Sequence, residues 1–388
     1  MRRIEKRRFT KKQLDSFLFF FAYSLYLITA IVNISFLIPG ASEYGKTTMV
    51  VCASIVIFKE LLLYRLNKKE TFYLLVSSLL SLIIFLHTNG FLMFPLFILI
   101  YGSRRIDFSR IAKFSLIVLS ILFAIVVICA KTGLIVDYTS FANGRERDYL
   151  GFRYALFPSM IGLNIIALAT YLNKENKITK YAFLLLFSYL LFEYTDSRLS
   201  FAISLLIIVS VFLIRKYILT SKNRNKLFRI TPFTYIICSV ISLTLVFTFS
   251  INNPVMRSID EKVEHRISLG NSSLNSYPVN LLGHNVEYVG AGLNENGKRS
   301  NKEYNYVDCL YLNLLEKYGA IYLIAYIAIL TRSMMNLEKR KDYVLLIIMC
   351  LFAIIGMLDD LGMFLHYNTF LFAASAGFLP QNIKGAKK

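Results

Sequence analysis

The sequence predicts an all-α polytopic membrane protein, and its composition, its long apolar runs and the placement of its basic residues support this fold class. The chain has 388 residues, of which 56% are hydrophobic and only 18% are charged, and its mean hydropathy is +0.54. Soluble domains carry about a quarter charged residues. The formal net charge of +20 would indicate a nucleic-acid partner only if the basic residues clustered on a solvated domain, and the sequence has no such domain.

Apolar runs of about 17 to 25 residues are long enough to cross the roughly 30 Å hydrocarbon core of a bilayer as helices. We expect a single membrane domain over residues 1–388, with long connecting segments at 132–153 and 251–306. The run 90–102 is short and contains Pro95, so a tilted or re-entrant half-hairpin is an alternative there. About twelve runs meet or approach the length of a span, at residues 17–38, 47–64, 71–86, 90–102, 114–131, 154–172, 180–195, 199–215, 232–250, 307–330, 343–358 and 361–379.

The basic residues predict the orientation of these spans. If the N-terminus lies in the cytoplasm and the spans alternate, most of the 44 Lys and Arg residues fall in inner segments, as the positive-inside rule requires. Both termini are then cytoplasmic, and the protein is a multi-pass protein of the cell membrane with both long segments outside. The first apolar run has no A-x-A cleavage site after it, so we interpret it as an uncleaved helix.

The cysteines indicate neither a metal site nor a disulfide framework. They lie in or beside apolar runs and have no C-x-x-C spacing. We therefore interpret them as packing residues: Cys52, Cys129, Cys238, Cys309 and Cys350.

The two outer segments are the longest polar parts of the chain, and we expect function there because the inner loops are short. Within the second segment, apolar residues recur among charges from Met256 to Leu269. This pattern predicts a short amphipathic helix on the membrane surface, and a solvated linker is the alternative.

Four arginines in these outer regions form a predicted anion site, namely Arg147, Arg153, Arg198 and Arg266. A guanidinium matches phosphate oxygens with two parallel hydrogen bonds and never loses its charge. The anionic ligand expected beside an outer leaflet is a lipid pyrophosphate. For Arg198 the alternative is a snorkelling arginine that pairs with Asp196 or Glu193.

Lys59 and Glu60 are a different case, because they lie toward the cytoplasmic end of the second span. A structural pair or snorkelling is the favoured interpretation of these two residues.

Several short elements in the outer regions resemble those of Wzy-type polysaccharide polymerases from capsule and exopolysaccharide clusters of Gram-positive bacteria. They occur in the family's order and on the expected side of the membrane. The elements are Arg147–Arg153 (RDYLGFR), Thr195–Arg198 (TDSR), His265–Leu269 (HRISL), Asn280–His284 (NLLGH) and Val307–Gly319 (VDCLYLNLLEKYG).

The resemblance implies a GT-C-like glycosyltransferase that works at the outer leaflet without metal, cofactor or nucleotide sugar. Its donor would be the growing glycan on undecaprenyl pyrophosphate, and its acceptor would be the non-reducing sugar of a new lipid-linked repeat unit. A flippase and a chain-length regulator of the same pathway would be its partners, beside membrane lipid. The adjacent pair Asp359-Asp360 agrees with this, since it is not a spaced Asp-x-Asp metal motif.

Glycosyl transfer also needs a base for the acceptor hydroxyl. His265, His284, Asp308 and the Asp359-Asp360 turn are the outer candidates, and the family position favours His284 or Asp308 as catalytic. The alternatives are a helix N-terminal aspartate for Asp308 and an ordinary loop histidine for His284.

Two other functions fit the same layout. One is an O-antigen-ligase-like transferase, which moves a finished glycan to another acceptor. The other is a flippase or transporter of the lipid-linked oligosaccharide, which predicts charged residues along the middle of several helices. Such residues are scarce in the sequence.

Overall fold

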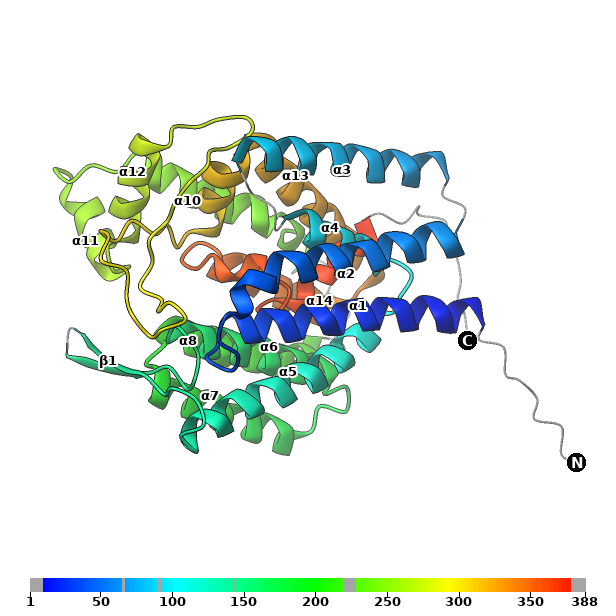
Figure 1. The fold of residues 1–388 in the computed structure, drawn as a ribbon, viewed down its shortest axis with the longest axis horizontal. Coiled ribbons are helices and arrows are strands. Elements are labelled where there is room, and N and C mark those ends of the chain that lie inside the picture. The colour runs from blue at the N-terminus through cyan, green and yellow to red at the C-terminus, as the bar shows by residue number, and fades with distance from the viewer. Residues whose placement is uncertain (1–9, 65–66, 89–92, 143, 219–227, 378–388) are drawn as a thin grey trace, which may run out of the picture.

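The computed structural model describes residues 10–64, 67–88, 93–142, 144–218 and 228–377, which are mostly helical (Figure 1). The first half contains α1 (Lys11–Asn33), α2 (Ala41–Leu63), α3 (Lys68–Thr88), α4 (Met93–Gly102), α5 (Phe108–Lys131), α6 (Leu156–Leu172), α7 (Ile178–Thr195) and α8 (Arg198–Leu213). The second half contains η1 (Ile214–Ile218), η2 (Thr231–Phe233), α10 (Thr234–Phe247), α11 (Pro254–Lys262), α12 (Arg266–Ser276), α13 (Leu310–Arg340) and α14 (Tyr343–Ile355). Both predicted cytoplasmic termini, 1–9 and 378–388, and the start of the short predicted span, 90–92, lie outside the described residues.

Five helices of the described residues are long and apolar enough to cross a membrane, namely α1, the Glu70–Thr88 part of α3, α5, Arg198–Tyr217 and α13. Shorter apolar helices of 10–17 residues stand beside them, including α4, α6 and α14. A large hydrophobic cluster extends from Phe19 in α1 to Ala374 near the C-terminus. The mostly helical fold is thus confirmed, and its apolar helices are compatible with a membrane protein.

Polar side chains fix several helix starts. Thr10 and Gln13 form a capping box at α1, in which Gln13 N donates to Thr10 Oγ1 at 3.3 Å and Thr10 N donates to Gln13 Oε1 at 2.9 Å. Asp107 caps α5 by accepting from Ser109 N at 2.8 Å. These caps set where the apolar helices begin.

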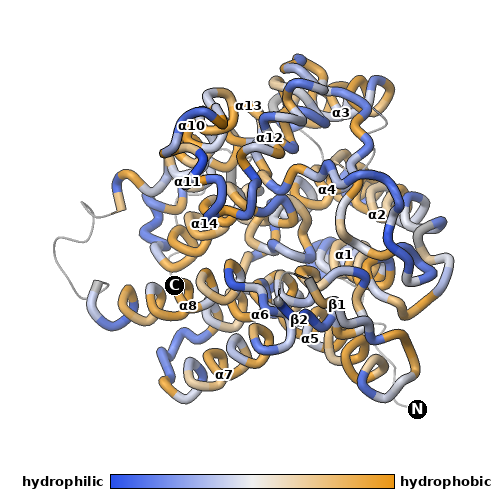
Figure 2. The backbone as a smooth tube through the Cα atoms, turned by 90° about the vertical axis from the view of Figure 1, so that its left-hand side faces the viewer, coloured by the Kyte–Doolittle hydropathy of each residue, from blue (hydrophilic) through white to orange (hydrophobic). Residues whose placement is uncertain are grey.

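The junctions between helices gather at two ends of the molecule. The hairpin end holds β1, β2, α11 and α12, opposite the beginning of α1 (Figure 1). Seen from the hairpin end, hydrophilic stretches run around α11 and β2, and the helices behind them are mostly hydrophobic (Figure 2). The segments that the charge count assigns to one side of the membrane therefore lie together.

The connecting segment 132–153 contains an antiparallel hairpin of β1 (Thr139–Ala142) and β2 (Arg145–Asp148). Thr139 pairs with Asp148 and Ala142 with Arg145. A two-stranded hairpin places alternate residues on one face, so Arg145 and Arg147 share a face of β2.

The amphipathic helix predicted over Met256–Leu269 is wrong as one continuous helix. Glu264 and His265 have left-handed φ angles of 57° and 62°, and they separate α11 from α12. Asp260 stabilises the break, because its Oδ1 accepts from Ile267 N at 2.9 Å and Ser268 N at 3.0 Å. The carboxylate thereby caps the N-terminus of α12.

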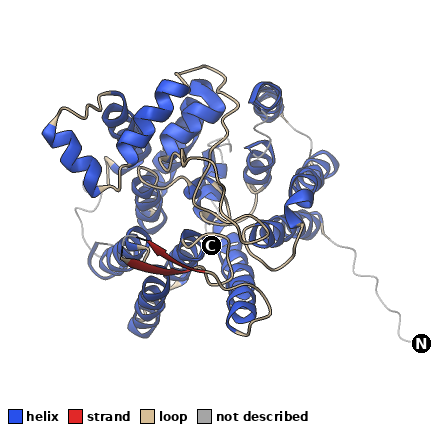
Figure 3. Ribbon diagram, turned by 60° about the vertical axis from the view of Figure 1, so that its left-hand side comes forward, coloured by secondary structure: helices blue, strands red, loops and turns tan. Residues whose placement is uncertain are grey.

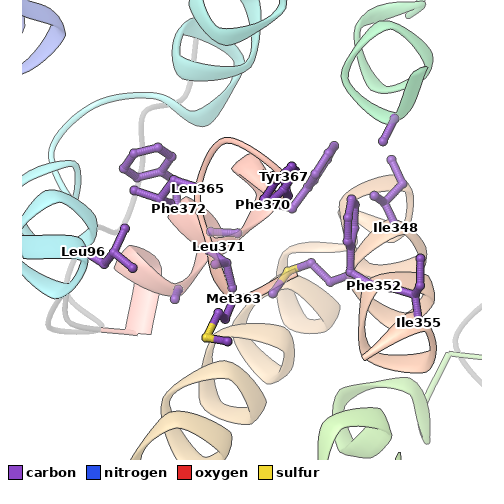
Figure 4. Packing of buried hydrophobic residues seen from close by; sticks show 14 of the residues in the cluster. Leu96, Ile348, Phe352, Ile355, Met363, Leu365, Tyr367, Phe370, Leu371 and Phe372 are labelled. Atoms are coloured by element: carbon purple, nitrogen blue, oxygen red, sulfur yellow. The ribbon is translucent and has the colours of Figure 1, made fainter. Parts of the chain in front are cut away.

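The predicted span 361–379 is also wrong as an α-helix. Its described residues form the 3-10 turns η3 (Leu361–Met363) and η4 (Thr369–Gly377), packed inside the bundle against α4 and α14 (Figure 4). Asn164 of α6 stabilises the irregular backbone, since its side chain donates to His366 O at 3.1 Å and accepts from Thr369 N at 3.2 Å. Apolar composition alone predicted a helix, but non-helical backbone is tolerated where protein satisfies its polar groups.

Helix α13 is broken at Gly319, which has φ 86° and ψ 169°. The segment 280–284 crosses the break, where Ala320 N donates to Asn280 O at 2.9 Å and His284 N donates to Glu316 O at 2.7 Å. A Cβ on Gly319 would meet a backbone oxygen of this segment at 2.3 Å, so only glycine fits.

At the end opposite the hairpin, buried charges form a cluster that we call the paired cluster. Its carboxylates and cations are Asp15, Glu60, Glu70, Lys59, Arg104 and Arg105. Lys59 Nζ lies 2.8 Å from Asp15 and 2.9 Å from Glu60, and Arg105 bridges Glu60 and Glu70. The structural pair predicted for Lys59 and Glu60 is thus confirmed.

Candidate functional site

A pocket of about 220 Å³ lies at the hairpin end, where β2, the α7–α8 junction, the α11–α12 junction and the turn after α14 meet. Figure 3 turns this end of the molecule forward. We call it the arginine pocket, and its charged lining residues are Arg145, Arg147, Arg198, Lys262, Arg266, Asp196, Glu264 and Asp359. Three of the four arginines selected from the sequence therefore lie in one pocket, in which cations outnumber carboxylates.

Arg145 forms hydrogen bonds with two other residues that line this pocket. Its guanidinium donates to the Asp196 carboxylate, to Asp196 O at 2.8 Å and to Glu264 Oε1 at 2.7 Å. Burial opposes ionisation of Asp196, but the hydrogen bond and charge of Arg145 outweigh it and lower the pKa of Asp196. Arg145 therefore joins β2 to the α7–α8 and α11–α12 junctions and is already neutralised by protein.

Arg147 and Arg266 are placed differently, because each has a buried N–H group without a hydrogen-bond partner among the described residues. These groups are Arg147 Nε and Arg266 Nη1. Arg266 Nε lies 3.6 Å from Asp308 Oδ2, and no ion pair of Arg147 occurs in the described part of the chain. Leaving a charged donor unpaired is costly, so this pocket is suited to a ligand with several acceptor oxygens.

Arg198 lies at the N-terminus of α8, and its side chain is 70% exposed. It pairs with Asp196, Nε to Oδ1 at 3.6 Å, as one of the sequence interpretations expected. The first turn of α8, from Ser197 to Ser200, lines the pocket, and no side chain caps the helix. Uncapped backbone N–H groups and the positive end of the helix dipole favour an anion at this position.

A second pocket, of about 360 Å³, adjoins the first. We call it the acidic pocket, since Asp308, Asp359 and Asp360 line it together with Tyr304 and Tyr306. Tyr154, Leu156 and Asp359 line both pockets, so they form the wall between them.

The three carboxylates of the acidic pocket have different surroundings. Asp360 Oδ2 accepts from Tyr306 at 2.7 Å and from Asn313 Nδ2 at 2.9 Å, whereas Asp359 Oδ1 accepts from Leu361 N at 2.8 Å. Asp308 Oδ2 is shared between Tyr304, at 3.5 Å, and Arg266.

These surroundings raise the pKa of each carboxylate. Burial raises the pKa of Asp308, and Arg266 offsets part of this effect. Burial also raises the pKa of Asp359, to about 7, against the opposing charge of Arg266. Burial and the neighbouring Asp359 raise the pKa of Asp360. With its pKa raised to about 7, Asp359 is suited to proton transfer at neutral pH.

Arg153 and His284 lie outside the arginine pocket, although Arg153 lines the acidic pocket beside it. Arg153 Nε donates to Ser35 O at 3.0 Å and its Nη2 donates to Glu295 at 3.3 Å, which ties the end of α1 to the long segment. His284 Nε2 lies 2.6 Å from Pro278 O, beside the break in α13, and His284 lines neither pocket. The structure therefore places Asp308, and not His284, beside the clustered arginines.

Sequence reasoning missed Arg145 and Lys262 and did not choose Asp359 among the base candidates. A signal for Arg145 was present, because Asn143-Gly144 is a dipeptide typical of two-residue hairpin turns. The period of two in a strand then places Arg145 beside Arg147. No comparable local signal marks Lys262 or Asp359.

The arrangement joins a cationic pocket to a pocket of carboxylates and tyrosines. Such a pair can stabilise an anionic leaving group on one side and accept a proton on the other. Comparison of the chain with protein families, curated proteins and solved structures found no match.

Proposed function

We propose that the protein is a GT-C-like membrane glycosyltransferase with about twelve spans that polymerises undecaprenyl-pyrophosphate-linked repeat units into capsular or exopolysaccharide. The observation that carries the proposal is the arginine pocket, where Arg147 and Arg266 have buried donors without a protein partner. A pyrophosphate supplies the oxygens that two guanidinium groups and an uncapped helix N-terminus can bind.

In this proposal the hairpin end faces the outside of the cell, and the paired cluster lies at the cytoplasmic end. The donor places its pyrophosphate in the arginine pocket and its isoprenoid tail in the bilayer. As the bond to the sugar breaks, Arg147 and Arg266 neutralise the charge that develops on the lipid pyrophosphate. Prearranged donors of this kind are typically worth about 2.7 to 4 kcal/mol each.

A flippase is less well supported than a transferase. Transport of a charged headgroup needs polar groups along a path through the middle of the bundle. Among the described residues, the buried charged side chains lie in or next to the groups at the two ends: Asp15, Lys59, Glu60, Glu70, Arg104, Arg153, Asp260, Glu316, Asp359 and Asp360.

Conservative substitution tests the pyrophosphate clamp. Arg147→Lys and Arg266→Lys keep the charge but lose the forked geometry, so cells that carry either variant should lose long polysaccharide and accumulate lipid-linked single repeats. Arg257→Lys is the matched control, because Arg257 is exposed and, in the described part of the chain, forms an ion pair only with Glu261 in α11. Unchanged chain lengths in both pocket variants, at normal protein levels, would contradict the proposal.

The ligase-like alternative is tested by the products of the purified protein with lipid-linked repeat units. A polymerase yields a ladder of products that each differ by one repeat, whereas a ligase yields one addition to a separate acceptor. Labelling of a cysteine placed at the exposed Ser300 by a membrane-impermeant maleimide in intact cells tests the orientation. Labelling only after lysis would contradict it.

A further inference from the structure

We infer that the acidic pocket holds the non-reducing terminal sugar of the acceptor, and that Asp359 in the wall between the pockets is the catalytic base. This inference rests on the proposed function. The position of the wall supports it, because Asp359 lines both the pocket for the leaving group and the pocket beside it. A base for glycosyl transfer has to reach the acceptor hydroxyl while that hydroxyl faces the anomeric carbon of the donor.

The lining of the acidic pocket suits the end of a saccharide. Its volume of about 360 Å³ falls in the lower part of the range for small-molecule pockets, roughly 300 to 1,000 Å³. Tyr154, Tyr304 and Tyr306 offer aromatic faces and hydroxyl groups. Gly292 leaves room in the lining, because a Cβ there would meet no atom closer than 3.8 Å, whereas Gly290 packs closely against the Tyr306 ring. The pocket thus combines apolar ring faces with acceptors for sugar hydroxyls.

The hydrogen bonds distinguish Asp359 from the other two carboxylates. Asp360 is anchored by Tyr306 and Asn313, which both donate to its Oδ2. Asp308 is shared between Tyr304 and Arg266, so it is a positioning residue for that arginine. Asp359 Oδ1 is held by Leu361 N, and its Oδ2 has no hydrogen-bond partner among the described residues. One oxygen fixes the carboxylate, and the other is left for the acceptor hydroxyl.

The step balances without a co-reactant. The acceptor oxygen forms a bond to the anomeric carbon of the donor glycan, and the bond between that carbon and the pyrophosphate oxygen breaks. The hydroxyl proton passes to Asp359, and the lipid pyrophosphate leaves with the electron pair. Its charge is held by Arg147 and Arg266 in the arginine pocket.

The test separates acceptor binding from donor binding. Asp359→Asn removes the base, and Gly292→Leu fills the acidic pocket from a position where a side chain meets no strain. Asn301→Leu is the matched control, since Asn301 is exposed in the same segment and lines neither pocket. Each variant is assayed for polysaccharide chain length in cells and, after purification, for binding of geranyl pyrophosphate, a short isoprenoid pyrophosphate that probes the arginine pocket.

We expect Asp359→Asn to reduce polymerisation at least about 100-fold, in line with the typical contribution of a general base, and Gly292→Leu to reduce it by excluding the acceptor from the acidic pocket. Gly292→Leu should bind geranyl pyrophosphate within about twofold of the wild type, and Asp359→Asn should bind it at least as tightly, because it removes a carboxylate from the lining of the arginine pocket. Asn301→Leu should match the wild type in both assays. Gly292→Ala, with its smaller side chain, should fall between. If Asp359→Asn and Gly292→Leu both polymerise normally while Arg147→Lys does not, the inference fails and the proposed function stands. If the wild type does not bind geranyl pyrophosphate, the proposed function itself fails.

Discussion

The two ends of the molecule both contain buried charged residues, but they use them in opposite ways. In the paired cluster every charged group lies within 3.6 Å of an opposite charge, and Lys59 and Arg104 are fully buried. In the arginine pocket the cations exceed the carboxylates, and Arg147 has no ion pair among the described residues. A buried N–H group without a hydrogen bond occurs at both ends, at Arg147 Nε and Arg266 Nη1 in the pocket and at Arg104 Nε in the paired cluster. The comparison indicates which charges maintain the fold and which await a ligand.

The physical reason is the cost of removing a charge from water. A buried ion is tolerated when partners compensate its desolvation, and removal of one partner leaves the other uncompensated. The paired cluster meets this condition within the protein. In the arginine pocket the cations remain in excess until an anion binds. The excess positive charge is therefore available to bind an anionic ligand.

The largest effect is expected in the paired cluster. Lys59→Met leaves Asp15 buried without a cation, while Glu60 keeps Arg104 and Arg105, so it should lower the free energy of unfolding by about 3 to 5 kcal/mol. Thermal unfolding of the detergent-solubilised protein measures this, with the exposed Lys113→Met as control. A melting temperature equal to that of the wild type would show that the cluster is not what stabilises this end.

At the arginine pocket the opposite pattern is expected. Arg147→Met should slow polymerisation about 100- to 1,000-fold without lowering the melting temperature, because it removes an unpaired cation. The rate of repeat addition and thermal unfolding are measured on the same preparation, beside Arg257→Met. A large loss of stability in Arg147→Met would show that Arg147 stabilises the fold, as the charges of the paired cluster do, and would contradict the comparison.

Anion binding should raise the free energy of unfolding only when the arginine pocket is intact. Inorganic pyrophosphate at about 100 times its Kd should raise the free energy of unfolding by about 2.7 kcal/mol. Arg147→Met should lose this stabilisation, and Lys59→Met should keep it. Equal stabilisation of both variants would indicate that pyrophosphate binds elsewhere.

The smallest expected effect is a pH dependence from Asp359, which faces the charged groups Arg266, Asp308 and Asp360. The base acts when ionised, so the polymerisation rate should rise as pH increases to about 7 and fall about tenfold for each pH unit below it. The folded state retains a proton that the unfolded chain releases above about pH 4. The contribution of Asp359 to stability should therefore decrease between about pH 4 and 7. A pH–rate profile that is flat across this range would contradict its role.

Much of the fold could be predicted from the sequence, because a helix satisfies its own backbone and its apolar length is read directly. The prediction failed where tertiary contacts replaced local ones. Residues 361–379 have the composition of a span, but Asn164 bonds to their backbone and permits 3-10 turns. The helix expected over Met256–Leu269 is divided because Asp260 caps a second helix start.

By itself, the sequence determined the mostly helical class, the apolar runs and the selection of Arg147, Arg198 and Arg266. Only the tertiary structure decided that these three line one pocket, that Arg153 does not, and that Asp359 stands between two pockets. The contacts that build the site join residues far apart in the chain, such as Arg145 and Glu264, which are 119 positions apart. Local composition determines helices because their hydrogen bonds are local, but a binding site depends on which distant ends the packing brings together.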